Sequence, residues 1–463
     1  MRRRALTALL LLAVAVAAMI AVFVDRGPRA APAGALAGGP PVPKLLGIQS
    51  VGQIELLRLD PRTLRPWAGR RVPLGSEGCA PRDGGSVCWS VPPWSFSPDR
   101  SRLAVARHET GVVRGLRLVD VRRMRAATDI PIKPSGAIGL LAWPQSDRLL
   151  AIQEVCCDGR QQVLVIDAGK RAVTARRPLS GTVEGAGRTA RELVLLVAPA
   201  KRIGPARLAV IDERGDVRIA ALDRIRAGSR LLPGDDFLIR HRRPGLAVDP
   251  HGRRAYVVDP HGVAAVDLAT LTVSYHEPSE QRSLAARIRD WLVPAASAKG
   301  VNGPTRTARW LGDGRLAVTG IDEELARDAR GEERQRTRPA GLRLIDTREW
   351  TYRVIDPGVT AVRVAGRSLL ATGQSVDLAP GAAKTTGLAA YTLDGRRRFT
   401  LFEGREAWVE QVAGRRAFVQ AGVGTVGTAP EPRVVDLRSG RVSKRPTVLP
   451  TLLLEPAWSW WDE

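Results

Sequence analysis

One pattern recurs eight times along this chain: an aliphatic segment of alternating character that ends in Asp and is followed by a short polar turn. Segments such as VLVID at 163–167 and LAVID at 208–212 have the period of two that is typical of β-strands. In the turn that follows, the Asp carboxylate can accept hydrogen bonds from backbone N–H groups two residues on. The eight Asp residues are therefore predicted to form turns and to have no catalytic role: Asp60, Asp120, Asp167, Asp212, Asp267, Asp346, Asp394 and Asp436.

A second hairpin precedes most copies of this pattern, with turns such as SPDR at 97–100, DPHG at 249–252 and LGDG at 311–314. Each unit then contains four strands, and a four-stranded unit of about 40 to 50 residues is typical of a propeller blade. One blade cannot bury both of its faces, so consecutive blades must stack and share a core. The sequence predicts an all-β propeller with four-stranded antiparallel blades.

The two ends of the chain complement each other. The first unit, LLGIQSV, IELLRLD and RRVPL, supplies only three strands, and the last residues, TLLLEPAWSW at 451–460, have no unit of their own. The tail EPAWSW is similar to PPWSFSPD at 92–99, so we expect it to complete the first blade by pairing of the N- and C-terminal strands. That count gives eight blades; seven follow if the first unit is an appendage.

The strand–Asp–turn units and the SPDR-type hairpins resemble the YVTN and quinoprotein-like β-propeller superfamily over residues 45–457. The resemblance implies an architecture and no particular activity, because propellers of this kind include enzymes, receptors and scaffolds. Eight-bladed quinoprotein dehydrogenases also carry adjacent cysteines against pyrroloquinoline quinone. Their docking pattern is hinted at only in LDPRTLRPW at 59–67, and neither Ca²⁺ ligands nor a catalytic Asp can be assigned, so no cofactor is predicted.

The N-terminus reads as a membrane anchor. After MRRR, an apolar run from Ala5 to Val24 has about the 20 residues that a helix needs to cross a bilayer. The three arginines before the run are expected to stay on the cytoplasmic side. Residues 1–27 are predicted to be a cytoplasmic stub and a single-pass anchor, and residues 28–43 a Pro/Ala/Gly-rich linker. The propeller, 44–463, then lies outside the cytoplasm, or is secreted if the segment is a cleaved signal peptide.

The net charge of +24 predicts attraction to anionic lipids, acidic wall polymers or nucleic acid. Arginine carries nearly all of it, as a biased amino-acid usage would produce, since lysine occurs at only seven positions. No Lys/Arg block is long enough to form a dedicated patch. Specific nucleic-acid binding is therefore not expected, and electrostatic adhesion is kept as a weaker alternative.

The four cysteines are interpreted as structural. An even number in an oxidising compartment favours disulfides, and three pairings are possible. We favour Cys79 with Cys88 and Cys156 with Cys157, while cross-links between the two groups stay open. No His accompanies the cysteines at ligand spacing, so no metal site is predicted.

The connections between strands differ in length. Loops between the second and third strands of a blade, and links between blades, share one face of a propeller, which we call the long-loop face. Its longest connections are 75–93, 223–243, 277–306, 321–340, 374–386 and 422–431. The segment SLAARIRDWLV at 283–293 predicts a short amphipathic helix, and 321–340 is expected to be solvated or partly disordered.

Motifs for nucleophilic or metal-assisted catalysis are missing from the sequence: there is no G-x-S-x-G, H-E-x-x-H or Walker loop. Long loops on a rigid scaffold favour binding. We therefore expect a non-enzymatic scaffold whose long-loop face binds a protein, a peptide or a cell-wall polymer. The alternative is an enzyme that uses the central channel, either a quinoprotein-like oxidoreductase or a lactonase- or glycosidase-like hydrolase.

Overall fold

The structure, a computed structural model, describes residues 45–444 and Thr451–Leu452, apart from the longer gaps 60–65, 232–238, 281–302, 328–332, 374–386 and 423–430 and a few short ones. All described residues belong to one compact unit, Leu36–Glu463. The predicted anchor, the linker and the helix at 283–293 lie outside the described residues. Within those residues, no helix has the length and apolar character needed to cross a membrane.

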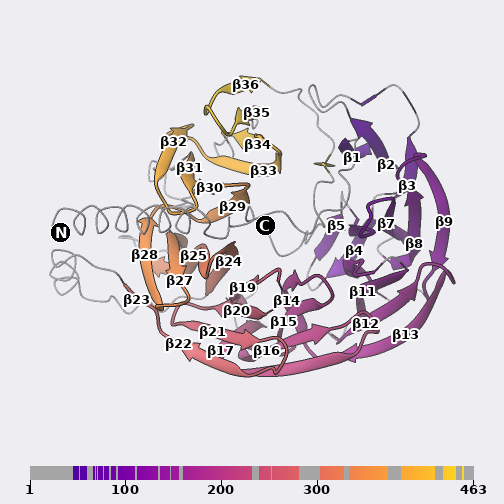
Figure 1. Cartoon of the computed structure of the whole chain (residues 1–463), viewed down its shortest axis with the longest axis horizontal. Coiled ribbons are helices and arrows are strands. Elements are labelled where there is room, and N and C mark those ends of the chain that lie inside the picture. Colours follow the sequence, from indigo (N-terminus) through magenta and orange to yellow (C-terminus); the bar gives the residue numbers. More distant parts are fainter. Residues whose placement is uncertain are drawn as a thin grey trace, which may run out of the picture. The chain divides into compact units, whose positions relative to one another are not determined.

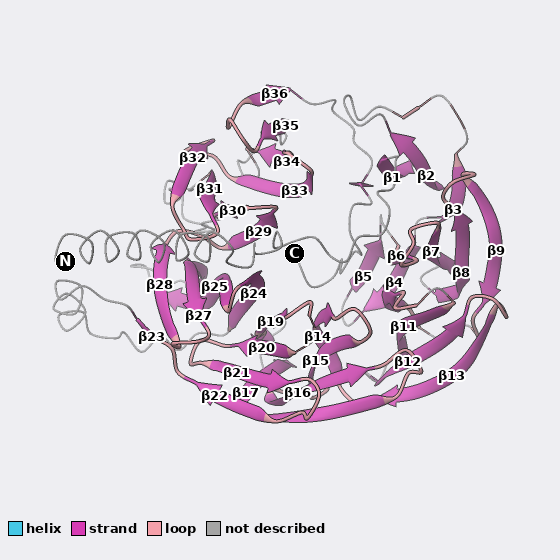
Figure 2. Cartoon of the chain, viewed as in Figure 1, coloured by secondary structure: helices cyan, strands magenta, loops and turns pink. Residues whose placement is uncertain are grey.

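Eight blades, each with four antiparallel strands, follow one another along the chain, and in two of them further strands extend the sheet. The predicted propeller of eight blades is thus confirmed (Figures 1 and 2). The strands of the first four blades are β1 (Leu45–Val51), β2 (Gln53–Leu59), β3 (Val72–Ser76) and β37 (Thr451–Leu452); β6 (Trp94–Phe96), β7 (Arg102–Glu109), β8 (Val112–Asp120) and β9 (Arg125–Pro131); β10 (Ile138–Ala142), β11 (Arg148–Val155), β12 (Arg160–Asp167) and β13 (Ala172–Leu179); and β14 (Thr182–Arg188), β15 (Leu193–Ala198), β16 (Gly204–Ile211) and β17 (Val217–Leu231).

The other four blades consist of β19 (Gly245–Val248), β20 (Arg254–Val258), β21 (Val263–Asp267) and β22 (Val273–His276); β24 (Pro304–Gly312), β25 (Arg315–Arg327), β27 (Leu342–Asp346) and β28 (Thr351–Asp356); β29 (Ala361–Ala365), β30 (Ser368–Thr372), β31 (Leu388–Thr392) and β32 (Arg397–Leu401); and β33 (Ala407–Ala413), β34 (Arg416–Ala421), β35 (Glu431–Asp436) and β36 (Val442–Lys444). The strands outside this pattern are β4 (Gly78–Arg82), β5 (Gly85–Trp89), β18 (Ile239–Arg242), β23 (Ser279–Glu280) and β26 (Glu333–Pro339).

The first blade is completed from the C-terminal end of the chain. β37 pairs with β1, with Leu452 opposite Gly47 and Thr451 opposite Ile48. The predicted pairing of the terminal strands is thus confirmed, and the alternative that the first unit is an appendage is wrong. The strand that pairs is Thr451–Leu452, which precedes EPAWSW; that tail lies outside the described residues.

The core lies between consecutive sheets. One apolar cluster joins Leu56 of the first blade to Leu103 of the second, and another joins Leu208 of the fourth blade to Val257 of the fifth. Because alternate residues of each strand face opposite neighbours, a single blade contributes to two clusters. The fourth and fifth blades approach closely at Gly187 in β14, where a Cβ atom would lie 2.4 Å from Cγ2 of Val248.

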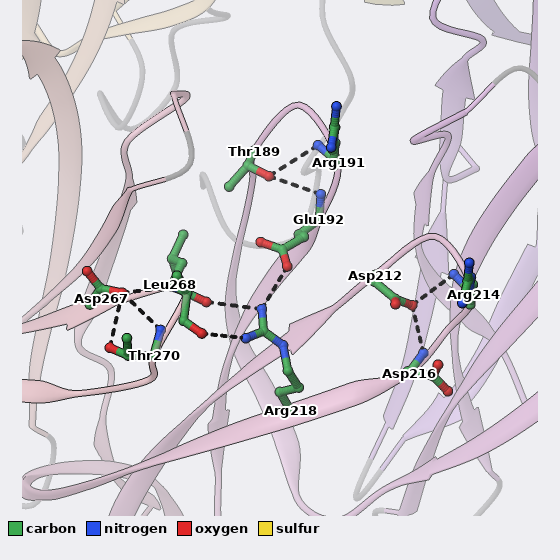
Figure 3. A network of polar contacts seen from close by, with 11 residues as sticks. Thr189, Arg191, Glu192, Asp212, Arg214, Asp216, Arg218, Asp267, Leu268 and Thr270 are labelled. Atoms are coloured by element: carbon green, nitrogen blue, oxygen red, sulfur yellow. Dashed lines mark hydrogen bonds and ion pairs between the residues drawn. The ribbon is translucent and has the colours of Figure 1, made fainter.

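Three of the turns at the strand-ending Asp residues are joined to the preceding blade by arginine. Figure 3 shows one such contact, which starts from Arg218 of β17. Its guanidinium donates to the carbonyl oxygens of Leu268 and Ala269, both at 3.0 Å, and to Glu192 at 2.7 Å. The two carbonyls belong to the turn that Asp267 organises in the fifth blade. We call this contact between an outer-strand arginine and the next blade's turn the arginine clasp.

The arginine clasp recurs along the chain. Arg353 of β28 donates to the carbonyl of Asp394 in the seventh blade. Arg398 of β32 donates to the carbonyl of Arg438 in the eighth blade, at 3.3 Å. Hydrogen bonds made by a charged donor are stronger than neutral ones, so the clasp reinforces the apolar contact between sheets at the rim.

Removing one clasp should weaken the fold locally. Arg218→Met keeps most of the side chain's length but removes the guanidinium that donates to the three acceptors. We expect the free energy of unfolding to fall by about 1 kcal/mol; the loss is modest because the site is partly exposed. Arg226→Met, an exposed arginine on the same strand, is the matched control and should change stability little. Urea unfolding measures both. Equal effects of the two substitutions would contradict a specific role for the clasp.

Candidate functional site

Three of the expected long loops are β-hairpins. β4 and β5 form one within 75–93, β17 extends beyond its blade to pair with β18 within 223–243, and β25 extends beyond its blade to pair with β26 within 321–340. They connect second to third strands or one blade to the next, so they belong to the long-loop face.

Of the two alternatives expected for 321–340, a partly disordered segment is wrong for the described residues, which form strands, while a solvated segment stays a prediction. β25 and β26 form a ladder of seven residue pairs, from Ile321 opposite Pro339 to Arg327 opposite Glu333. The register sets Asp322 against Arg338. Opposite charges directly across an antiparallel pair stabilise it, so the dense mixture of both signs supports strands here.

The hairpins from the fourth and sixth blades are joined to each other. Arg243, which follows β18, forms a parallel bridge with Thr305 of β24. Its N–H donates to Pro304 at 3.0 Å, and its carbonyl accepts from the N–H of Arg306 at 2.7 Å. The strands β17, β18, β24, β25 and β26 thereby form one accessory sheet, and we call the contact around Arg243 and Thr305 the bridge.

A glycine allows the backbones to meet at the bridge. A Cβ atom at Gly303 would lie 1.6 Å from the carbonyl oxygen of His241, a distance that no side chain could occupy. Any larger residue at 303 would therefore separate β18 from β24.

Charged side chains of both signs surround the bridge. His241 has its Nε2 atom 3.1 Å from Oγ1 of Thr305 and 3.4 Å from Oε2 of Glu323. Arg243 pairs with Glu184 of β14 at 3.4 Å. Arg306, whose side chain is only 7% exposed, pairs with Asp322 at 2.8 Å. The fourth and sixth blades thus contribute to one network of paired charges.

The imidazole of His241 is held in its neutral form. Burial lowers its pKa from the ordinary 6.5; the Glu323 carboxylate opposes this effect, and the Arg243 guanidinium adds to it. In a catalytic triad, a hydroxyl and a carboxylate contact different nitrogens of the imidazole. Here Thr305 and Glu323 both contact Nε2, so the arrangement holds three strands together without aligning a nucleophile.

Elsewhere, a polar cleft of about 420 Å³ lies between the third and fourth blades. It is lined by both signs of charge, including Asp147, Arg148, Glu213 and Arg214. The cleft lies beside the short turns, on the opposite face from the bridge. In the described part of the chain, no group of three or more His, Cys, Asp or Glu side chains is placed to hold a metal ion.

Six of the strand-ending Asp residues accept hydrogen bonds from backbone N–H groups of their own turns: Asp120, Asp167, Asp212, Asp267, Asp346 and Asp436. At Asp267 these bonds, led by that from Thr270, lower the pKa of the carboxyl. Asp394 differs, because its carboxylate accepts from the Thr392 hydroxyl and from Arg396. Asp60 lies outside the described residues.

The backbone places two of the four cysteines together. Cys79 and Cys88 are directly opposite each other in the β4–β5 ladder. Cys156 and Cys157 lie outside the described residues. No motif in the sequence marks His241, one of five scattered histidines, or Gly303, the glycine that lies against its backbone.

Several solved structures are similar to this chain, and the first of them supports the fold. Dihydro-heme d1 dehydrogenase NirN in complex with DHE aligns with a TM-score of 0.52 and 13% identity over 89% of this chain and 75% of that chain. Apo AztD from Citrobacter koseri gives 0.41 and 12% over 88% and 96%. The WD40 domain of Toxoplasma gondii coronin gives 0.37 and 13% over 76% and 78%. No protein-family profile matches the sequence, and no curated protein matches it closely enough to count as a relative.

The molecule is an eight-bladed β-propeller. This is the architecture that the resemblance of the strand–Asp–turn units to YVTN and quinoprotein-like propellers implied. At 13% identity, the likeness to NirN shows the fold alone.

Acid should loosen the bridge. Because the pKa of His241 is lowered on folding, its contribution to stability is complete above its ordinary pKa of 6.5 and is lost as the pH falls below that value. After correction for intrinsic rates, hydrogen exchange of the Arg243 and Arg306 amides should speed up between about pH 7 and about pH 5.

His241→Gln should remove this pH dependence, and His251→Gln, in an exposed turn, should leave it unchanged. A pH profile that persists in His241→Gln would assign the effect to another group.

Proposed function

We propose that this chain is a membrane-tethered, extracytoplasmic propeller that acts as a non-enzymatic binding scaffold through its long-loop face. The observation that carries the proposal is the accessory sheet: hairpins from the fourth and sixth blades project from one face and are locked together at the bridge. Binding residues are commonly found on such elaborations of a rigid scaffold.

The two faces of the propeller support this choice of surface. In six of the short turns the strand-ending carboxylate binds backbone N–H groups, and in three an arginine clasp binds a carbonyl. On the long-loop face, the chain instead builds extra strands that no blade needs for its own core. A preorganised surface loses little conformational entropy when a partner binds.

The membrane attachment rests on the apolar run Ala5–Val24 and its preceding arginines. An uncleaved anchor with a Pro/Ala/Gly-rich linker would hold the propeller near the outer surface of the membrane, within reach of a membrane protein or of cell-wall polymer. Cleavage of the segment would release the same propeller as a secreted protein.

Site-specific photocrosslinking in the cells that make the protein tests the binding face. A crosslinking residue at position 338, on β26, should trap a defined partner. One at position 176, on the outermost strand of the third blade, is the matched control, since Arg176 and Arg338 are both exposed arginines on strands. Equal products from both positions, or none from 338, would contradict the proposed face.

We also propose that Cys79 and Cys88 form a disulfide that staples the β4–β5 hairpin. Residues directly opposite in an antiparallel ladder have Cα atoms about 4.5 to 5.5 Å apart, within the range that a disulfide spans. Peptide mapping under non-reducing conditions should recover the two residues in one linked fragment. Recovery of Cys79 or Cys88 linked to Cys156 or Cys157 would replace this pairing with a cross-link between segments.

A further inference from the structure

The chain enters the propeller on the face opposite the long-loop face. We call this opposite face, which carries the turns between the first and second and between the third and fourth strands of each blade, the short-turn face. In the first blade, β1 and β2 are the second and third strands, so the connection between them lies on the long-loop face. Leu45, the first residue of β1, is therefore at the short-turn face. The segment that precedes Leu45 joins the propeller on that side.

An exposed tryptophan lies on the same blade, close to this entry. Trp67 is 52% exposed, more than any other large apolar residue in the part of the chain that the structure describes. Its N–H donates to the carbonyl of Arg58 at 2.9 Å, and Arg58 is opposite Leu46 in the β1–β2 ladder. Neighbouring strands are about 4.8 Å apart, so the backbone of Trp67 lies about 10 Å across the sheet from Leu46.

The exposed indole ring is held in place by the backbone around it. Pro66 forms a bridge with Leu59, and the N–H of Trp67 is bound to the next residue of β2, Arg58. A tryptophan side chain has a large apolar ring and one polar N–H, and it is enriched where lipid meets water. Trp67 thus has the chemistry of a membrane-interface residue at a fixed position beside the chain entry.

Exposed arginines lie on the same face in the two neighbouring blades. They occupy the turns at the strand-ending Asp residues of the second and eighth blades: Arg122, Arg125, Arg438 and Arg441. None of these four side chains forms an ion pair with the residues that the structure describes. The carboxylates of the two turns instead accept backbone N–H groups, and Asp120 also pairs with Arg123 at 3.7 Å. The four arginines are therefore suited to bind the phosphates of an anionic lipid surface.

The predicted anchor would bring this surface to a bilayer. Only the 20 residues 25–44 separate Val24, the last residue of the apolar run, from Leu45. A flexible chain of that length has an r.m.s. end-to-end distance of about 25 Å. A surface tethered so closely meets the bilayer at a high effective concentration, so a few weak contacts are enough to hold it there.

We infer that the propeller docks with its short-turn face on the anionic surface of the membrane to which it is tethered. Trp67 lies in the headgroup region, and the arginines of the second and eighth blades contact lipid phosphates. This inference rests on the proposed function, specifically on the membrane tether, and gives it an orientation. The long-loop face points away from the membrane, toward the partner.

Fluorescence quenching in lipid nanodiscs tests the docking. The full chain carries a fluorescent non-natural amino acid at position 67 or at position 219, the matched control, since Ile219 is 50% exposed on an outermost strand of the fourth blade. The discs contain nitroxide-labelled lipid in phosphatidylglycerol mixed equally with phosphatidylcholine, or in phosphatidylcholine alone. In the anionic discs, quenching at 67 should exceed that at 219 at least about threefold, and it should fall in the neutral discs. Equal quenching at the two positions, or in the two lipids, would overturn the inference.

Charge-neutral variants separate this surface from general electrostatic attraction. Arg122→Gln/Arg438→Gln should lower the quenching at position 67 in anionic discs at least about twofold. Arg226→Gln/Arg230→Gln removes the same charge from two exposed arginines of β17 on the long-loop face, and it should change the quenching little. Equal effects of the two double variants would assign the attraction to net charge and overturn the docking surface.

The tryptophan is tested with the fluorophore at position 98, in an exposed turn of the second blade on the same face. Trp67→Ser should lower the quenching there at least about twofold, and Trp67→Tyr, which keeps an interfacial ring, should retain most of it. Unchanged quenching in Trp67→Ser would contradict the role of Trp67. A chain that does not assemble into the discs would remove the tether and the docking together. Assembly without quenching at position 67 would leave the tether and remove only the docking.

Discussion

The stacking of each sheet against the next is the interaction on which the rest of this structure depends. Clusters such as that of Leu208 and Val257 bury apolar residues from both members of a pair of blades, and each blade from the second to the seventh takes part in two such contacts. With both faces of a sheet covered, polar groups are confined to strand ends, connections and inner edges. The places where this chain can do chemistry or bind a partner are therefore set by the core before any functional residue is chosen.

The two faces of the propeller differ in how the polar groups of the backbone find partners. On the short-turn face, Asp267 binds the N–H groups of its turn, and Arg218 binds the carbonyls that the turn presents, so little backbone is left for a partner. On the long-loop face, the chain continues strands past the blades and must then satisfy them. The bridge does this for β18 and β24, and β26 is left with one edge without a strand partner in the described part of the sheet.

The sequence predicted what is periodic and local. Alternating strands, their count and the turn-forming Asp residues follow from patterns a few residues long. The arginine clasps could not be found in this way. Arg218, Arg353 and Arg398 lie at different distances, six, seven and four residues, after the strand-ending Asp of their own blade, and their partners belong to the next blade. The β25–β26 hairpin was missed for a related reason: its charges look unpaired until the register sets Asp322 against Arg338.

Some of the many arginines make specific structural contacts. A bias in amino-acid usage can supply arginines, but it does not decide where they go. Arg218 reaches three acceptors with one planar fork, and Arg306 is nearly buried while it contacts Asp322 and two carbonyls. A lysine ammonium offers no such fixed fork. Biased composition and specific structural use are therefore compatible, and the bias supplied the residue type that suits contacts between turns of neighbouring blades.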